Sequence, residues 1–249
     1  YISLICDHSE KNFRKIVKQL KLKFNKSYIF GRGPSLEKVY GYNLSDGARI
    51  ICNQTVNNID LLNKIRPHVI IAGDHCWNMG CSKLADNFRK DSVNWIINNN
   101  SIFVLPLDCY PIMLEHYPEL KGKIAGIPLK DSENNFDILS NYWVKGSMGV
   151  LFEFLLPIAC TISKEINMIG FDGNDRPKES KPDYKVPYSH YKKAEYSDDI
   201  VQSIHHSRPG YYERDFTEFR LNYDKLFIKL VKDAEEEGYL DGMKDEHDK

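Results

Sequence analysis

Long hydrophobic runs are absent from the sequence. No stretch approaches the roughly 18 consecutive apolar residues of a membrane-spanning helix, and no signal peptide is visible. A surplus of one charge is absent as well, because 34 basic and 35 acidic residues give a formal net charge of −1. No overall field would attract a polyanion, so we expect no nucleic-acid partner.

The sequence also lacks the paired spacing of cysteines and histidines that is typical of zinc sites. Cys76 and Cys81 are the closest pair and His75 lies beside them, but no second pair completes a zinc pattern, so we expect no bound metal. Several cysteines lie in apolar runs, which favours buried free thiols and a reducing, cytoplasmic location. The six are Cys6, Cys52, Cys76, Cys81, Cys109 and Cys160.

What the chain does contain is enough apolar material, 42% of 249 residues, for one large domain. Short apolar runs alternate with helical patterns, which predicts a Rossmann-like α/β fold: a mainly parallel sheet with helices on both faces. We expect a single domain over 1–240, a lid-like loop at about 174–197, and a disordered acidic tail at 241–249. The expected strands are 1–6, 27–30, 49–52, 69–72, 102–105 and 166–171. The expected helices are 9–24 with Ser9 as its cap, 34–39, 59–64, 83–98, 198–205 and 215–237. A further buried helix is expected to end at 161 and to kink at Pro157. The segment 106–142 is expected to hold loops and short helices.

The first expected helix carries a basic face. A solvated face is the favoured interpretation, and peripheral contact with an anionic membrane, at its inner face, is the alternative. The residues are Lys11, Arg14, Lys15, Lys18, Lys21 and Lys23.

A glycine-rich turn follows the apolar run at 27–30. Two glycines and then a proline and a serine are typical of a strand–turn–helix phosphate cradle, because glycines allow close approach and helix N–H groups favour an anion. No third glycine and no Gly-Lys-Ser/Thr follow, so the turn is neither a dinucleotide fingerprint nor a Walker loop. A tight turn without a ligand is the alternative. The turn consists of Gly31, Arg32, Gly33, Pro34 and Ser35.

Polar residues follow the next two expected strands as well. Asn53 comes directly after 49–52, and Asp74 follows 69–72. Because parallel strands place their carboxyl ends at one edge of the sheet, where ligands bind in such folds, we expect these residues to meet the glycine-rich turn there.

Several later residues are candidates for chemistry. His190 and His206 are candidates for a general base, since the reference pKa of histidine suits that role. Arg208 could bind a carboxylate of a ligand or pair with an acidic residue. Asp172, at a strand end, would be the nucleophile of a retaining enzyme or simply a turn residue.

Four motifs, taken in order, resemble the bacterial sialyltransferases of glycosyltransferase family 42 and related Kdo transferases. The resemblance covers about residues 27–212. The motifs are Gly31-x-Gly33-Pro34-Ser35-Leu36, Cys52-Asn53-Gln54, the turn at 146–149 before a buried helix, and Ile169-Gly170-Phe171-Asp172.

The resemblance implies a glycosyltransferase that takes an acidic sugar from a CMP-activated donor without a metal ion or other cofactor, as in polysaccharide biosynthesis. It implies an oligosaccharide or glycolipid acceptor, and a homo-oligomer is compatible with it. Arg32 and Asp74 depart from the asparagines that sialyltransferases carry there, which leaves the sugar open between nonulosonic and Kdo types. The implied nucleotide contacts are Gly31, Gly33, Pro34, Ser35 and Asn53, with Arg32 and Asp74 beside them; the implied donor-sugar and phosphate contacts are Ser147, Gly149, Tyr184 and Tyr188.

Two other functions remain open at this stage. One is a Mg²⁺-dependent phosphotransferase similar to pterin pyrophosphokinases, which would need a carboxylate pair such as Asp172 and Asp175. The other is a nucleotide-sugar binding domain without catalysis.

Overall fold

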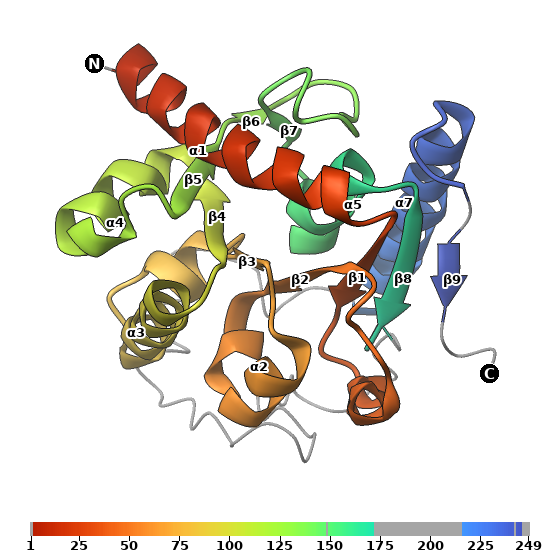
Figure 1. Cartoon of the computed structure of the whole chain (residues 1–249). Helices are drawn as coiled ribbons and strands as arrows, with labels where there is room; N and C mark the ends of the chain where they lie inside the picture. Colours follow the sequence, from red (N-terminus) through yellow and green to blue (C-terminus); the bar gives the residue numbers. More distant parts are fainter. Residues whose placement is uncertain (1, 148, 172–215, 242, 246–249) are drawn as a thin grey trace.

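The computed structural model describes residues 2–147, 149–171, 216–241 and 243–245, and they form an α/β fold around a seven-stranded sheet (Figure 1). All strand pairs in this sheet are parallel, in the order β5-β4-β3-β2-β1-β8-β9. The predicted Rossmann-like fold class is therefore confirmed, while the expected lid at 174–197 lies outside the described residues. The strands are β1 Lys26–Phe30, β2 Ala48–Cys52, β3 Val69–Ile71, β4 Ile102–Pro106, β5 Ile124–Ile127, β8 Glu165–Ile169 and β9 Met243–Asp245. A separate small pair is formed by β6 Leu129–Lys130 and β7 Val144–Lys145.

The order of the strands reverses beside β1. The chain builds β1 to β5 toward one edge and then returns to place β8 on the other side of β1. In open α/β sheets, ligands bind beyond the carboxyl ends of the strands at such a reversal. The glycine-rich turn follows β1, so the sequence motif and the topological switch point coincide.

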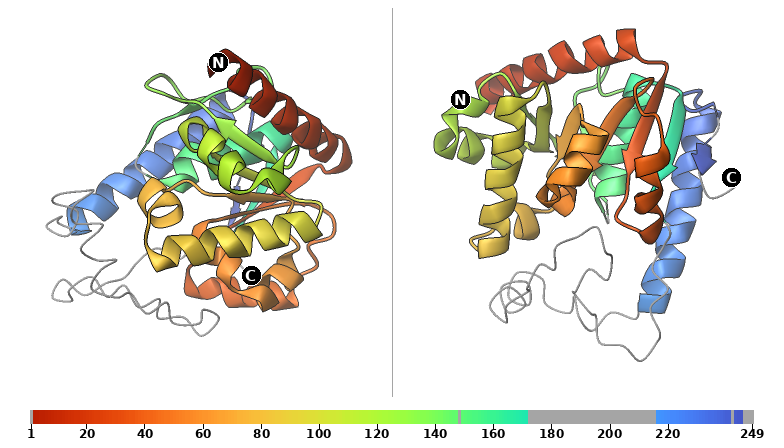
Figure 2. Two further views of the ribbon diagram at one scale, coloured as in Figure 1. Left: turned by 90° about the vertical axis from the view of Figure 1, so that its left-hand side faces the viewer. Right: turned by 60° about the horizontal axis from the view of Figure 1, so that its bottom comes forward.

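One face of the sheet is covered by the crossover helices between β1 and β5. Because side chains alternate along a strand, Phe30, Ile51 and Phe103 all point to this face and are buried under those helices. The helices are η1 Pro34–Gly41, α2 Ile59–Ile65, α3 Lys83–Asn98 and α4 Tyr110–His116. Figure 2 shows α3 and α1 on opposite sides of the sheet.

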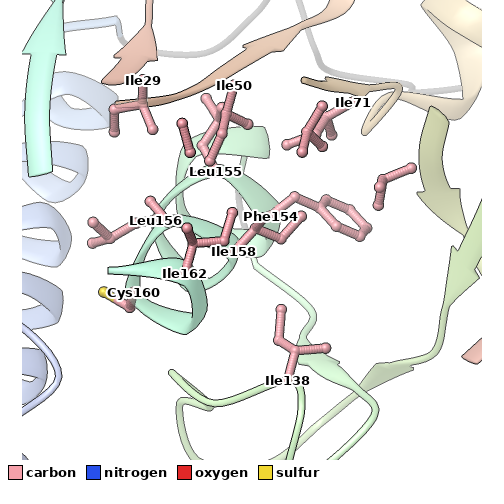
Figure 3. Close-up of a cluster of buried hydrophobic side chains, with 14 of the residues drawn as sticks. Ile29, Ile50, Ile71, Ile138, Phe154, Leu155, Leu156, Ile158, Cys160 and Ile162 are labelled. Carbon is pink, nitrogen blue, oxygen red and sulfur yellow. The ribbon is translucent and has the colours of Figure 1, made fainter. Parts of the chain in front are cut away.

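The other face is covered by α1 Ile2–Lys23, α5 Leu156–Ile162 and α7 Phe216–Glu236. Ile29, Ile50 and Ile71 face α5 in the buried cluster of Figure 3. Every residue of α5 is buried, which confirms the predicted buried helix. The irregularity lies just before Pro157, in the π-helical turn η6 Leu151–Leu155, and Pro157 itself occupies the first turn of α5, where proline is tolerated.

The amino-terminal prediction was wrong. Residues 1–6 were expected to form a strand, but α1 runs continuously from Ile2 to Lys23. Ser9 is not a cap, because it is buried inside this helix and docks α1 on β5: its Oγ donates to the Gly126 carbonyl at 2.7 Å and accepts from the Gly126 N–H at 2.6 Å. A six-residue apolar run fits both helical and strand periods, and packing on β5 decides between them.

Two strands of the seven-stranded sheet, β5 and β9, were missed, and so was the small pair β6 and β7. The four residues of β5 include Ala125 and Gly126, whose strand propensity is low, so the segment 106–142 was expected to lack a strand. In the tail, Met243–Asp245 pairs with β8, so the prediction of disorder is wrong for these residues. Backbone hydrogen bonds to an open edge do not depend on apolar side chains, and charged residues suit an edge strand.

The end of α7 follows its sequence signals. Gly238 has a φ of +75° and its N–H donates to the Glu235 carbonyl at 3.0 Å, as expected of a glycine C-cap. Leu230 is buried in the core, and Tyr223, Leu226 and Phe227 pack against it at helical spacing. Among the described residues, no helix is long and apolar enough to cross a bilayer.

Candidate functional site

The glycine-rich turn is locked onto the end of β8. The N–H of Gly31 donates to the Ile169 carbonyl at 2.8 Å, and the N–H of Gly33 donates to the Gly170 carbonyl at 2.7 Å. The hydroxyl of Ser35 accepts from the N–H of Gly170 at 3.1 Å. These two backbone donors of the expected cradle are therefore committed to the fold, and Pro34 has no N–H to offer.

Gly31 is required by packing. A β-carbon at this position would lie 2.2 Å from the carbonyl oxygen of Gly170, which itself has a φ of +82°. The sequence interpretation assigned this glycine to the approach of a ligand. In the structure, the close partner is the backbone of the neighbouring strand end.

Arg32 brings a positive charge to the end of β2. Burial raises the pKa of the Cys52 thiol to about 12, and the nearby Arg32 guanidinium opposes that rise. Arg32 is half-buried. A half-buried guanidinium at the switch point can bind a phosphate or a carboxylate through two parallel hydrogen bonds.

Asn53 connects the loops that follow β2 and β3. Its Oδ1 accepts from the Gly73 N–H at 3.3 Å and from the Asn78 side-chain amide at 2.8 Å. Its backbone has a φ of +48°, a region that asparagine tolerates better than most residues. Its Nδ2 donates to no other described residue, which leaves one donor at this edge for a ligand.

Asp74 opens the loop after β3. Its carbonyl accepts from the Asn78 N–H at 2.9 Å, at the start of the π-helical turn η3 His75–Met79. The side chain is half-buried. Asp74 and Asn53 therefore meet through Asn78, as the sequence predicted for residues at adjacent strand ends.

The turn at 146–149 reaches the same edge. Val150, directly after it, packs against Gly73, because a β-carbon on Gly73 would lie 2.6 Å from Val150 Cγ2. Gly149 lies next to the ring of Tyr223 on α7. The Ser147 N–H donates to Glu153 Oε1 at 2.9 Å. The predicted donor-sugar turn thus abuts the predicted nucleotide loops.

Four buried oxygens in the loops along this edge have no hydrogen-bond partner among the described residues. They are Thr55 Oγ1, Asn57 Oδ1, Asn78 Oδ1 and Ser147 Oγ. Buried polar atoms are nearly always satisfied by protein or by ordered water, so such atoms are a common mark of ligand or water sites. Thr55 and Asn78 were not predicted, because in the sequence they are ordinary polar residues of loops. The available signal was their position three and seven residues past the ends of β2 and β3.

A separate cluster lies at the ends of β3 and β4. His75 Nε2 lies 3.1 Å from each carboxylate oxygen of Asp108, and the ligand atoms of His75, Asp108 and Cys109 lie within 4.8 Å of one another. Burial raises the pKa of the Cys109 thiol to about 12, and the Asp108 charge adds to the rise.

The remaining predicted site residues lie outside the described residues. They are Asp172, Tyr184, Tyr188, His190, His206 and Arg208. The structure therefore brings together Gly31, Arg32, Gly33, Ser35, Asn53, Asp74, Ser147 and Gly149 around one edge of the sheet.

Comparisons of the chain with protein-family models, with curated proteins and with solved structures find no match. The fold and the site define a Rossmann-like α/β protein with a polar site at its topological switch point. The likeness to family 42 rests on the four motifs and their order.

Proposed function

We propose that the protein transfers an acidic sugar, of nonulosonic or Kdo type, from a CMP-activated donor to a hydroxyl of an oligosaccharide or glycolipid acceptor. The observation that supports this proposal is the coincidence of the Gly31–Ser35 turn with the switch point, with Asn53 and Asp74 along the same edge. The donor-sugar turn at 146–149 meets them there.

The described residues supply specific contacts for such a donor. Asn53 Nδ2 offers a donor to the nucleotide, and the Arg32 guanidinium offers a charge to the phosphate or to the sugar carboxylate. Ser147 Oγ offers a hydroxyl to the sugar. Since Gly31 and Gly33 use their N–H groups on β8, the phosphate would depend on Arg32 more than on a backbone cradle.

The reaction needs a stabilised leaving group and a base. The bond from the anomeric carbon to the phosphate oxygen breaks, and its electron pair stays on the CMP phosphate, where Arg32 would stabilise the charge. The acceptor oxygen bonds to the anomeric carbon while its proton passes to a base. We assign the base to His190 or His206, which lie outside the described residues.

We place this reaction in the cytoplasm. The support is that Cys52, Cys109 and Cys160 are buried and unbridged, as in proteins of a reducing compartment. The exposed lysines of α1, Lys11, Lys15 and Lys18 among them, would suit the anionic inner face of a membrane if the acceptor is a glycolipid.

A thermal-shift experiment with CMP, CDP, GDP and ATP, each with and without EDTA, tests the proposal. Ligand at 100 times its Kd stabilises by about 2.7 kcal/mol, which raises the Tm by roughly 5–10 °C in a chain of this size. We expect that shift for CMP, unchanged by EDTA, and lost in Asn53→Ala but kept in the control Asn63→Ala, whose side chain is exposed on α2.

The contradicting results are equally definite. No shift with CMP would refute the proposal, and an EDTA-sensitive shift with ATP would favour the Mg²⁺-dependent phosphotransferase. The parent could also bind CMP but hydrolyse a CMP-sugar no faster than His190→Ala and His206→Ala, with no hydrolysis in any of the three. The protein would then be a nucleotide-sugar binding domain without catalysis.

A further inference from the structure

The register of β3 on β4 places His75 opposite Asp108. Ile71 pairs with Val104, His75 follows Ile71 by four residues, and Asp108 follows Val104 by four residues. His75 and Asp108 therefore lie at the same distance along the chain past paired residues of β3 and β4. Cys109 comes next in the chain, in the short helix η4 Leu107–Cys109.

The cluster is open on one side and anchored on the other. The side chain of Asp108 is 72% exposed and that of His75 is 40% exposed, whereas Cys109 is only 5% exposed. An ion could reach the His75 nitrogen and the Asp108 oxygens directly from solvent. The sulfur beneath them would form the floor of the site.

The donor atoms select the kind of ion. One imidazole nitrogen, one carboxylate and one thiolate suit Zn²⁺, whereas Mg²⁺ and Ca²⁺ prefer oxygen alone. Zinc bonds of about 2.0–2.3 Å imply ligand atoms roughly 3.3–3.8 Å apart in a tetrahedron. His75 Nε2 and the Asp108 oxygens already stand at 3.1 Å, and the spread of the whole set stays within 4.8 Å. To bind the ion, the exposed side chains of His75 and Asp108 would have to rotate and shorten the longer separations.

A nucleophilic Cys–His pair would be the competing role for these residues. Reactive cysteines are accessible and lie in electropositive surroundings. Cys109 is buried, and its immediate neighbour in the cluster is the Asp108 carboxylate. The surroundings therefore disfavour a nucleophilic role for Cys109.

We infer that His75, Asp108 and Cys109 form a Zn²⁺ site that ties the loop after β3 to the loop after β4. On binding, the thiol proton leaves to solvent, and the ion replaces the proton between His75 Nε2 and Asp108. Three protein ligands leave a fourth position for water. η3 also carries Asn78, the partner of Asn53, so the ion would lie near the proposed CMP site without contacting the nucleotide.

Titration of the metal alone tests this site. The full chain, freed of metal with a chelator and then desalted, is titrated with Zn²⁺ by calorimetry and with Co²⁺ by absorption. We expect about one equivalent to bind, with a thiolate-to-Co²⁺ charge-transfer band. Asp108→Asn and His75→Gln should each weaken binding by more than about tenfold, since even the outer partners of metal ligands change affinity by about 10- to 100-fold. Cys109→Ser should remove the band.

Matched controls separate this site from other thiols and imidazoles. Cys81→Ser and His116→Gln change exposed residues outside the cluster and should leave binding unchanged. Because Asp108 is exposed, Asp108→Asn should keep the parental Tm without metal, so its result does not depend on a folding defect. Absence of stoichiometric binding, or binding that Cys81→Ser removes and Asp108→Asn does not, would overturn the inference. CMP binding in EDTA is measured separately, so failure of one site leaves the other standing.

Discussion

The polar groups at the two ends of the sheet differ in how fully they are hydrogen-bonded. At the amino end, Arg49 donates to the carbonyls of Leu44, Gly47 and Arg66. Ser101 Oγ donates to the Pro67 carbonyl at 2.6 Å. Lys123 Nζ donates to the carbonyls of Ile96, Ile97 and Asn99. These side chains close loops and strand ends with the protein's own acceptors.

At the carboxyl end, hydrogen-bonding capacity is left over. Thr55 Oγ1, Asn57 Oδ1, Asn78 Oδ1 and Ser147 Oγ are buried without a partner among the described residues. The side-chain hydrogen bonds of Asn53 to described residues all use Oδ1, so its Nδ2 donates to no described residue. Both ends contain buried polar groups, so burial alone does not mark a site. Trp95 Nε1, near the amino end, also has no partner among the described residues, so the difference is one of number: several such oxygens gather at the carboxyl edge, which supports the proposed ligand site there.

The largest expected effect concerns the backbone corner at the switch point. Gly31→Ala should cost about 3 kcal/mol or more in unfolding free energy, because its β-carbon would meet the Gly170 carbonyl and backbone cannot move aside. Urea denaturation measures this cost. The matched control is Gly41→Ala, where nothing lies within 4 Å of the new carbon, so stability should be unchanged or slightly raised. Equal costs for both variants would contradict the packing role of Gly31.

Asn53 should show a smaller loss. Asn53→Ala removes the acceptor for Gly73 and Asn78 and leaves a residue poorly suited to a φ of +48°, so we expect a loss of about 2 kcal/mol. Asn53→Asp keeps an acceptor and should retain most of the stability. If the two variants unfold at the same urea concentration, the link between the two loops contributes nothing.

At the amino end, His68 should make the free energy of unfolding decrease at acidic pH. Burial, reinforced by the charges of Arg49 and Lys23, lowers the pKa of His68 to about 3, while the unfolded chain has a value near 6.5. Between these two values the unfolded state binds the extra proton, so stability falls as the pH drops from 6.5 toward 3, by up to about 1.4 kcal/mol per pH unit. Above pH 6.5 this group contributes no pH dependence.

Denaturation at pH 7 and pH 5 checks this expectation in the parent and in His68→Asn. The variant should lose less stability between the two pH values than the parent, because it lacks the group that the unfolded state protonates. Parallel losses would show that other groups govern acid sensitivity.

The smallest expected change in stability comes from a matched pair of serine substitutions, one at each end of the sheet. Ser101→Ala removes a satisfied hydroxyl and should cost about 1 kcal/mol. Ser147→Ala removes a buried hydroxyl that has no partner in the described part of the chain. It should be neutral or stabilising by a few tenths of a kcal/mol, while it weakens binding of a CMP-sugar. A clear loss of stability in Ser147→Ala would mean that this hydroxyl is already satisfied in the folded protein.

Much of the fold was predictable because local signals agreed with one another. Helix α3 was predicted at its observed bounds, since Ser82 caps it by accepting from the Ala85 N–H at 3.2 Å and an apolar stripe follows. Continuous apolar runs likewise predicted β2, β3, β4 and β8. The tail strand β9 and the helical start of α1 could not be predicted, because each depends on a neighbouring strand that is distant in sequence.

The position of the candidate site could be predicted from the sequence, but the roles of several of its residues could not. Asn53 and Asp74 lie at the carboxyl edge as the strand pattern implied, but the close contact of Gly31 with Gly170 requires β8, 139 residues further along. The cluster of His75, Asp108 and Cys109 depends on the register of two strands. The sequence analysis considered Cys76 and Cys81 beside His75 and expected no metal, because the approach of Asp108 and Cys109 to His75 cannot be read from spacing along the chain.

The central claim is that a cytidine nucleotide binds at the carboxyl edge beside the β1–β8 switch point. Backbone amide chemical shifts of the isotope-labelled chain, followed during a CMP titration in EDTA, test it most directly. We predict saturable shifts at Asn53, Gly73, Asp74 and Gly149, and none at Arg49, His68 or Ser101. Shifts confined to the amino end, or none that saturate, would contradict the claim.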